Sequence, residues 1–223
     1  MNADGGGADR PLLDITRALV PGHPNWPGDV PLTLEVSARI ADGSSVNVGA
    51  IRSSLHAGTH VDAPWHYDDA GARLGGVDLD RLVGEAVVLD VSAGEGLVGV
   101  PDLIGAIGEL EEPQALPPRV LLHTGEPDAW GAVFPRDFRA LDPDAVGWLA
   151  ARGVRLVGTD APSVDPLTSK DLPAHLAFAA QDLTIVEGLA LARVAPGRYE
   201  LLCLPLSLPE ADAAPARALL RPI

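Results

Sequence analysis

Proline and glycine interrupt this chain so often that long regular elements are excluded. The 223 residues include 24 glycines and 21 prolines. Proline lacks an amide hydrogen and glycine favours turns, so both residues end helices and strands. We therefore expect short elements joined by many loops. Because 47% of the residues are apolar, the chain can still build a core, and its length indicates one domain with elaborations.

An alternation of apolar and polar residues runs over residues 32–40. This pattern predicts a half-buried strand with one face in water. A second extended run over residues 46–55 follows a turn at residues 41–44. We expect the two runs to pair as an antiparallel hairpin.

Short apolar runs dominate the rest of the chain, at residues 86–91, 120–122, 154–157, 183–186 and 201–204. Helix signals lie between some of them. Asp142 is an N-cap residue, Pro143 suits the first helical position, and Gly153 suits the end. Two further helices are expected, one from Pro101 and one over residues 172–180. Strands that alternate with helices indicate parallel pairing, so we predict an α/β domain with a mixed β-sheet and flanking helices.

The charge of the chain excludes several kinds of partner. With 31 acidic and 16 basic residues, the net charge is −15, which repels nucleic acids and anionic membranes.

Residues 1–9 lack the apolar core of a signal peptide and are expected to be a disordered tail before a domain at residues 10–223. No run reaches the ~18 apolar residues of a membrane span. The single cysteine, Cys203, cannot form an intramolecular disulfide, which fits the cytoplasm.

Three of the six histidines fall within one short segment, at His56, His60 and His66. Asp62 lies between them, and imidazole nitrogens with a carboxylate oxygen form a ligand set that Zn²⁺ prefers. Gly58 and Pro64 disfavour a long helix, so we expect a tight loop in which Gly58 bends the backbone. The alternative is a polar surface loop whose histidines cluster by chance.

Residues 56–66, His-Ala-Gly-Thr-His-Val-Asp-Ala-Pro-Trp-His, resemble the His-x-Gly-Thr-His-x-Asp-x-Pro-x-His signature of the cyclase-like metal-dependent hydrolases. The chain is most similar to the bacterial kynurenine formamidases (arylformamidases) in that family. That likeness lies in residues 26–29, 153–158, 162–166, 168–170, 185–189 and 199–221. The resemblance therefore covers residues 10 to 223.

The resemblance implies a swivelling β/β/α arrangement, a homodimer, and hydrolysis of a small aromatic formamide. The substrate would be N-formyl-L-kynurenine, which gives L-kynurenine and formate in tryptophan degradation. It also implies two divalent metal ions per subunit, Zn²⁺ or Mn²⁺, which would activate water against a resistant amide. Two alternatives are a related enzyme that opens a cyclic aromatic amide, such as an isatin-type lactam, and a non-catalytic metal-binding module.

The family's site residues can be carried over to positions of this sequence. The implied metal ligands are His56, His60, Asp62, His175 and Glu187, with Asp62 as the bridge; the implied acid/base is His66, and Trp26 lines the substrate pocket. Glu187 interrupts an apolar run, where a charge is costly unless paired, although an outward-facing carboxylate on an edge strand is an alternative. His175 alone could equally be a surface histidine, and Trp26 could simply cap the core.

Four further residues, two histidines and two aspartates, are considered for roles around the cluster. His23 and His123 are expected not to bind metal, and His123 stands where the family tends to carry a basic residue such as arginine. Asp160 and Asp165 follow a strand. Both are candidates for holding ligating histidines in place, with turn or capping roles as the alternative.

Overall fold

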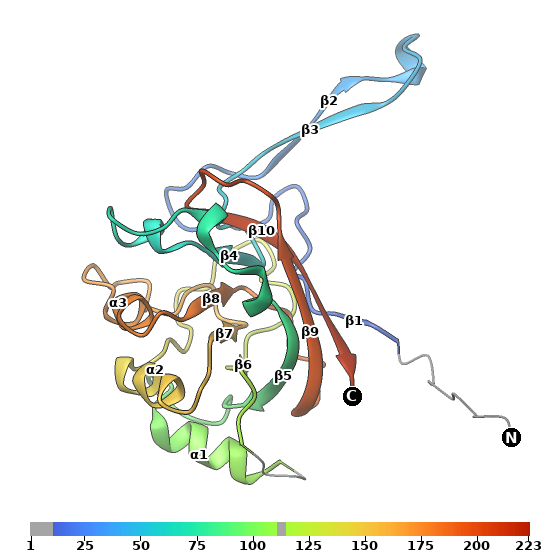
Figure 1. The fold of residues 1–223 in the computed structure, drawn as a ribbon. Coiled ribbons are helices and arrows are strands. Elements are labelled where there is room, and N and C mark those ends of the chain that lie inside the picture. The colour runs from blue at the N-terminus through green and yellow to red at the C-terminus, as the bar shows by residue number, and fades with distance from the viewer. Residues whose placement is uncertain (1–10, 111–114) are drawn as a thin grey trace, which may run out of the picture.

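Helices and strands are short throughout the part of the chain that the structure describes. The computed structural model describes residues 11–110 and 115–223, and the predicted tail at residues 1–9 lies outside them (Figure 1). The strands are β1 (Leu13–Asp14), β2 (Thr33–Ala38), β3 (Val48–Arg52), β4 (His60–Asp62), β5 (Val83–Asp90), β6 (Arg119–His123), β7 (Leu156–Thr159), β8 (Thr184–Glu187), β9 (Gly197–Pro205) and β10 (Ala213–Pro222). The α-helices are α1 (Val100–Gly108), α2 (Pro143–Ala150) and α3 (Pro173–Ala180).

Eight of these strands form one mixed sheet, as predicted. Their order is β1-β10-β4-β8-β7-β6-β5-β9. Strands β5 to β8 are parallel, with one helix between each consecutive pair, and the other pairings are antiparallel. Strand β9 pairs with both β5 and β10, so the sheet curls back on itself.

Alternation along the parallel strands divides the core into two layers. Ala86 and Val88 on β5 pack into the cluster that β9 and β10 cover, while Val87 and Leu89 pack into the cluster under the helices. Successive side chains of a strand point to opposite faces, which places alternate residues in different layers. Figure 1 shows the three helices on one side of the sheet and β9 with β10 on the other. This layering agrees with the β/β/α arrangement that the resemblance implies.

All three predicted helices are confirmed, and α1, α2 and α3 begin at Val100, Pro143 and Pro173, close to their expected starts. The carboxylate of Asp142 accepts a hydrogen bond from the amide of Asp144, and Pro143 occupies the first position of α2. Gly153 has a φ of 84° just beyond the end of α2. A left-handed residue at this point is the usual end of a helix.

Strands β2 and β3 pair with each other as predicted, but the expectation of a half-buried strand is wrong for the single chain. Leu34 lies opposite Ile51 in the antiparallel register, and these side chains are 53% and 60% exposed. Figure 1 shows the hairpin projecting away from the main sheet, which pairs with neither strand. Within the described residues nothing covers the apolar face of this hairpin.

Three strands of the main sheet, β1, β4 and β10, were not among the expected strands. Residues 60–62, which were expected in a tight loop, form β4 between β10 and β8. Strand β10, at residues 213–222, was not predicted at all. In the described residues no helix is long and apolar enough to cross a bilayer.

Candidate metal centre and substrate cavity

The register of three strands brings the candidate ligands together. His60 lies directly opposite Glu187 across the antiparallel pair of β4 and β8. Asp62 is two residues further along β4, so its side chain leaves the same face as that of His60. On its other side β4 pairs with β10, where Asp62 lies opposite Ala213. The three ligand candidates thus lie in the interior of the sheet.

Asp62 is the centre of the cluster. One carboxylate oxygen, Oδ1, lies 3.1 Å from His56 Nδ1 and 3.3 Å from His60 Nε2. The other, Oδ2, lies 3.6 Å from His175 Nε2. The Asp62 side chain has no exposed surface, so its charge can be compensated only by what this cluster holds.

Glu187 closes the cluster from the opposite strand. Its Oε2 lies 3.3 Å from His60 Nε2, and its Oε1 lies 3.6 Å from His175 Nε2. The amide of Val164 also donates a hydrogen bond to Oε1. Because β8 lies between β7 and β4 and Glu187 is only 4% exposed, the alternative of an outward-facing edge-strand carboxylate is wrong.

The rings of His175 and His60 are each oriented by a contact at Nδ1, on the side of the ring away from the cluster. The carboxylate of Asp165 lies 2.7 Å from His175 Nδ1 and also accepts hydrogen bonds from the amides of Ala174 and His175 at the start of α3. Asp165 therefore both caps the helix and holds His175. In His60, Nδ1 lies 3.1 Å from the carbonyl oxygen of Gly58. In both rings Nε2 is left facing the cluster.

Two glycines allow the ligand-bearing segments to approach each other. Gly58 has a φ of 64°, which fits the backbone bend predicted there. Gly188, directly after Glu187, has a φ of 66°, and a β-carbon added to it would overlap the carbonyl oxygen of Gly58. Only glycine fits this contact. The hydroxyl of Thr59 adds a hydrogen bond of 2.6 Å to the carbonyl oxygen of Gly188.

A cavity of about 340 Å³ opens onto the cluster. Aromatic and polar side chains from several loops line it, among them Trp26, Asp29, His56, His66, Trp130, Phe134, Ser163, Ser169, Lys170, His175 and Glu187. Trp26 and Trp130 both make edge contacts with Phe134, at ring-centroid distances of 5.4 and 5.7 Å. This wall suits a flat aromatic ligand.

The family model described as "Putative cyclase" matches residues 13–166 of the chain, which includes the histidine motif. The chain belongs to the cyclase family. Two curated relatives are named kynurenine formamidase. The one from Erythrobacter litoralis is 42% identical over 217 residues, which cover 96% of this chain and 95% of that protein. The one from Salinibacter ruber is 45% identical over 211 residues, which cover 94% and 97%.

Solved structures resemble this cyclase-family chain over most of its length. A "predicted metal-dependent hydrolase from Bacillus stearothermophilus" is 26% identical with a TM-score of 0.75, covering 96% of this chain and 98% of that one. Isatin hydrolase A from Labrenzia aggregata has a TM-score of 0.80 at 23% identity, covering 94% and 93%. At that identity the isatin hydrolase shows a shared fold alone.

The donor atoms of the cyclase-family cluster fit a divalent cation. Four buried atoms of this cluster have no hydrogen-bond partner among the described residues: His60 Nε2, His175 Nε2 and both carboxylate oxygens of Asp62. Unpaired buried polar atoms are rare in proteins because each loses its contact with water. Nitrogen and carboxylate oxygen donors that face one another in this way are the preferred surroundings of Zn²⁺ and similar ions.

Protons compensate the carboxylates when no cation is bound. Burial disfavours a charged ring, but the carboxylates of Asp62 and Glu187 outweigh it and raise the pKa of His60 to about 10. Against the same cost of burial, Asp165 and Asp62 raise the pKa of His175 to about 10. Burial also lowers the pKa of His56, but the carboxylates of Asp212 and Asp62 outweigh it and raise that pKa to about 9. The cluster thus attracts positive charge strongly.

His66 lies beside the cluster and at the cavity wall. Its ring centroid is 4.0 Å from that of His56 and 5.8 Å from that of His175. Burial lowers its pKa, so the ring is neutral near pH 7 and can accept a proton. His66, His56 and Asp62 also offer donor atoms within 4.8 Å of one another, so a ligand role for His66 needs a direct test.

Sequence reasoning missed several residues that shape the site, among them Asp212, and Arg17 beside the cavity wall of Trp130 and Phe134. Asp212, just before β10, lies 3.2 Å from His56 Nε2 and 4.0 Å from His66 Nδ1. Arg17 is 2% exposed, and its guanidinium lies 3.9 Å from the ring centroid of Trp130. Asp212 lies in a proline-flanked acidic loop, and Arg17 interrupts an apolar segment, so neither showed a pattern that pointed to the cavity.

The remaining histidines, His23 and His123, lie outside the cluster. His23 packs near Trp130, with their ring centroids 5.8 Å apart. His123 at the end of β6 lies 3.5 Å from Asp90 and 3.7 Å from Asp160. Asp160 accepts hydrogen bonds from Thr124 and from the amide of Glu126. It therefore supports a turn rather than a histidine of the cluster.

Metal binding should be coupled to proton release. At neutral pH the metal-free cluster holds protons on His56, His60 and His175, because their pKa values lie at about 9 to 10. A cation needs the neutral rings, so its affinity should fall as the pH drops from about 8 to about 6. Calorimetric titration with Zn²⁺ in buffers of different ionisation enthalpy counts the released protons. A His123→Gln control should release the same number, and binding without proton release would contradict this account.

Proposed function

We propose that this protein is a kynurenine formamidase, which hydrolyses N-formyl-L-kynurenine to L-kynurenine and formate in tryptophan degradation. The observation that carries the proposal is a buried cluster of metal-type donors that opens into an aromatic-lined cavity. The relatives named kynurenine formamidase match the chain over nearly its whole length at 42–45% identity. The isatin hydrolases share only the fold, so lactam opening is the less supported reaction.

We propose two divalent ions per chain, Zn²⁺ or Mn²⁺, held by His56, His60, Asp62, His175 and Glu187. The arrangement of the carboxylates supports this number, because in both Asp62 and Glu187 one oxygen faces His60 and the other faces His175. When bound, such ions would polarise the formyl carbonyl and make water a stronger nucleophile at neutral pH.

The chain's own groups supply binding and proton transfer in this proposal. Trp26 and Phe134 hold the aryl ring by stacking and edge contacts. His66, neutral near pH 7, takes a proton from the attacking water. As the bond between the formyl carbon and nitrogen breaks, that proton passes to the aniline nitrogen, which leaves as the free amine. A positioned acid/base of this kind contributes about 10²–10⁴-fold to the rate.

Hydrolysis of N-formyl-L-kynurenine by the purified protein tests the reaction. The absorbance of L-kynurenine follows turnover before chelation, after chelation, and after Zn²⁺ or Mn²⁺ is added back. We expect activity that disappears with the chelator and returns with the metal. Isatin serves as the comparison substrate: metal-loaded protein that opens isatin but leaves the formamide intact would replace the proposal with lactam hydrolysis.

Two variants separate the proposed roles of His66 and Asp62. His66→Ala should retain its metal and lose about 10²–10⁴-fold in kcat. Asp62→Asn should bind metal poorly, because it removes the charge that lies between the histidines. Metal content by atomic emission and kcat are measured on the same samples. Loss of metal from His66→Ala would make His66 a ligand, and a fully loaded, active Asp62→Asn would exclude the bridging role.

We further propose that the chain forms a homodimer in the cytoplasm. The exposed apolar face of the β2–β3 hairpin, formed by Leu34, Val36 and Ile51, supports a second copy as its cover, because exposed apolar patches of this kind mark interfaces. The unpaired, buried Cys203 supports a reducing compartment.

Sedimentation equilibrium tests the dimer. We expect twice the 23.1 kDa chain mass for the wild type and a shift toward the monomer for the double variant Leu34→Asp, Ile51→Asp. Thr33→Asp, on the other face of the hairpin, is the matched control and should stay dimeric. A wild-type protein of single-chain mass would refute this part of the proposal.

A further inference from the structure

Lys170 is the only lysine among the 16 basic residues of the chain, and the other 15 are arginines. This single lysine lines the cavity beside the candidate metal centre. The arginines of the described chain lie outside the cavity wall. A lysine ammonium is a compact point charge on a flexible stem, whereas arginine presents a wide planar fork. The position is therefore distinct both in its place and in its chemistry.

The segment that carries Lys170 is held in a defined conformation. The amide of Ser169 donates a 2.8 Å hydrogen bond to the carbonyl oxygen of Pro166. The Ser169 hydroxyl oxygen accepts a hydrogen bond from the amide of Leu172. Leu172 itself lines the cavity and has a φ of 46°, a left-handed conformation that a leucine adopts only when its surroundings fix it.

Asp29 brings the opposite charge to the same cavity from another loop. The amide of Asp29 donates to the carbonyl oxygen of Trp26, and Gly28 between them has a φ of 101°. This is a tight turn, and both of its ends, Trp26 and Asp29, line the cavity. The carboxylate of Asp29 accepts a 2.8 Å hydrogen bond from the Ser54 hydroxyl, which fixes the side chain.

Outside the metal-type cluster, Lys170 and Asp29 are the charged side chains of the described cavity wall. One is positive and one is negative, and the other lining side chains outside the cluster are aromatic, aliphatic or hydroxyl-bearing. We propose that this pair recognises the amino-acid end of the substrate, with Lys170 binding the α-carboxylate and Asp29 binding the α-ammonium group. This inference rests on the proposed function and assigns the part of the cavity that selects an amino-acid formamide over a simple aryl formamide.

The chemistry of the two groups fits a zwitterion with an apolar body. The aryl ring lies against Trp26 and Phe134, and the formyl group reaches the metal-type cluster. The amino-acid end then lies toward the loops that carry Lys170 and Asp29. An isatin-type lactam has no charged end, so it gains nothing from this pair. Lys170 and Asp29 are thus specificity-determining residues and take no part in bond breaking.

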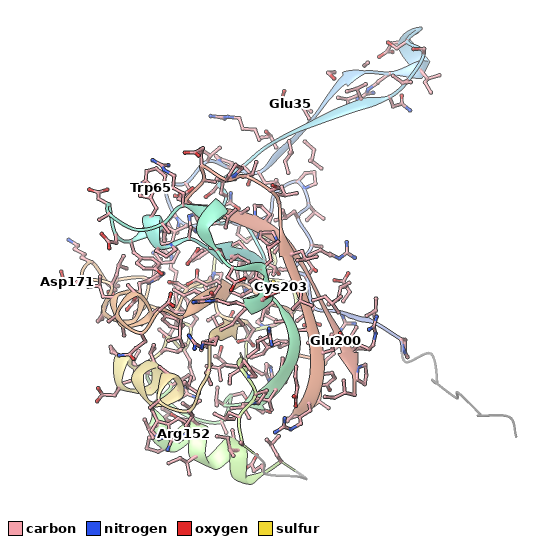
Figure 2. The ribbon with its side chains drawn as sticks, in the orientation of Figure 1. Glu35, Trp65, Arg152, Asp171, Glu200 and Cys203 are labelled. Carbon is pink, nitrogen blue, oxygen red and sulfur yellow. The ribbon has the colours of Figure 1, made fainter. Side chains whose placement is uncertain are left out.

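Binding of three related ligands to the metal-loaded protein tests this proposal. L-kynurenine carries both charged groups, ortho-aminobenzoylpropanoate lacks only the ammonium group, and ortho-aminoacetophenone lacks both. Dissociation constants are measured by quenching of tryptophan fluorescence for the wild type, Lys170→Met and Asp29→Asn. The control Arg152→Met removes a positive charge near α1 and α2, away from the loop of Asp171 that Figure 2 labels.

We expect Lys170→Met to weaken L-kynurenine and ortho-aminobenzoylpropanoate by about 10- to 100-fold, the size of a charge-assisted hydrogen bond. Asp29→Asn should weaken L-kynurenine alone. Neither variant should change the affinity for ortho-aminoacetophenone, and Arg152→Met should change none of the three. With N-formyl-L-kynurenine, Lys170→Met should raise KM and leave kcat close to that of the wild type.

Two results would overturn the inference. One is a wild-type protein that binds L-kynurenine no more tightly than ortho-aminoacetophenone, and the other is an unchanged affinity in Lys170→Met. Failure of the proposed function is seen separately, as absence of N-formyl-L-kynurenine turnover by metal-loaded wild type, because the binding measurement does not depend on turnover.

Discussion

The buried charge of Asp62 is the interaction on which the rest of the site depends. A carboxylate without exposed surface in the middle of a sheet is costly unless positive charge lies against it. Three histidines and the facing Glu187 surround it, and the shifted pKa values of these histidines show how strongly the cluster attracts protons or a cation. The close approach of Gly188 to Gly58 brings Glu187 near the histidine segment. The contacts of Asp165 with the start of α3 and with the His175 ring place His175 beside Asp62.

Local patterns predicted much of the fold. The apolar runs became strands, and Asp142, Pro143 and Gly153 marked α2 to within two residues. Residues 56–66 were predicted as metal-type donors because histidines and an aspartate so close together are informative without any knowledge of the fold. The resemblance added His175, which the structure places against Asp62, and Glu187, which it places against His60.

What the sequence did not reveal depends on contacts between distant segments. Strand β4 has three residues, too few for a periodic signal, and it is a strand only because β8 and β10 flank it. Strand β10 places Ala214, Ala216 and Ala218 toward the core, an alternation of small residues that is easily mistaken for loop composition. The exposed β2–β3 hairpin has the pattern of a half-buried strand, and no local pattern says what covers its apolar face.

The pairing of β4 with β10 has a consequence for the order of synthesis. Asp62 lies opposite Ala213, so the strand that carries two ligand candidates gains its second neighbour from a segment that is synthesised long after it. Strand β1 likewise pairs only with β10, through Leu219 and Leu220, and cannot join the sheet before these residues are synthesised. A nascent chain that already displays every histidine still lacks the framework that aligns them, and completion of the centre is delayed until β10 has been synthesised.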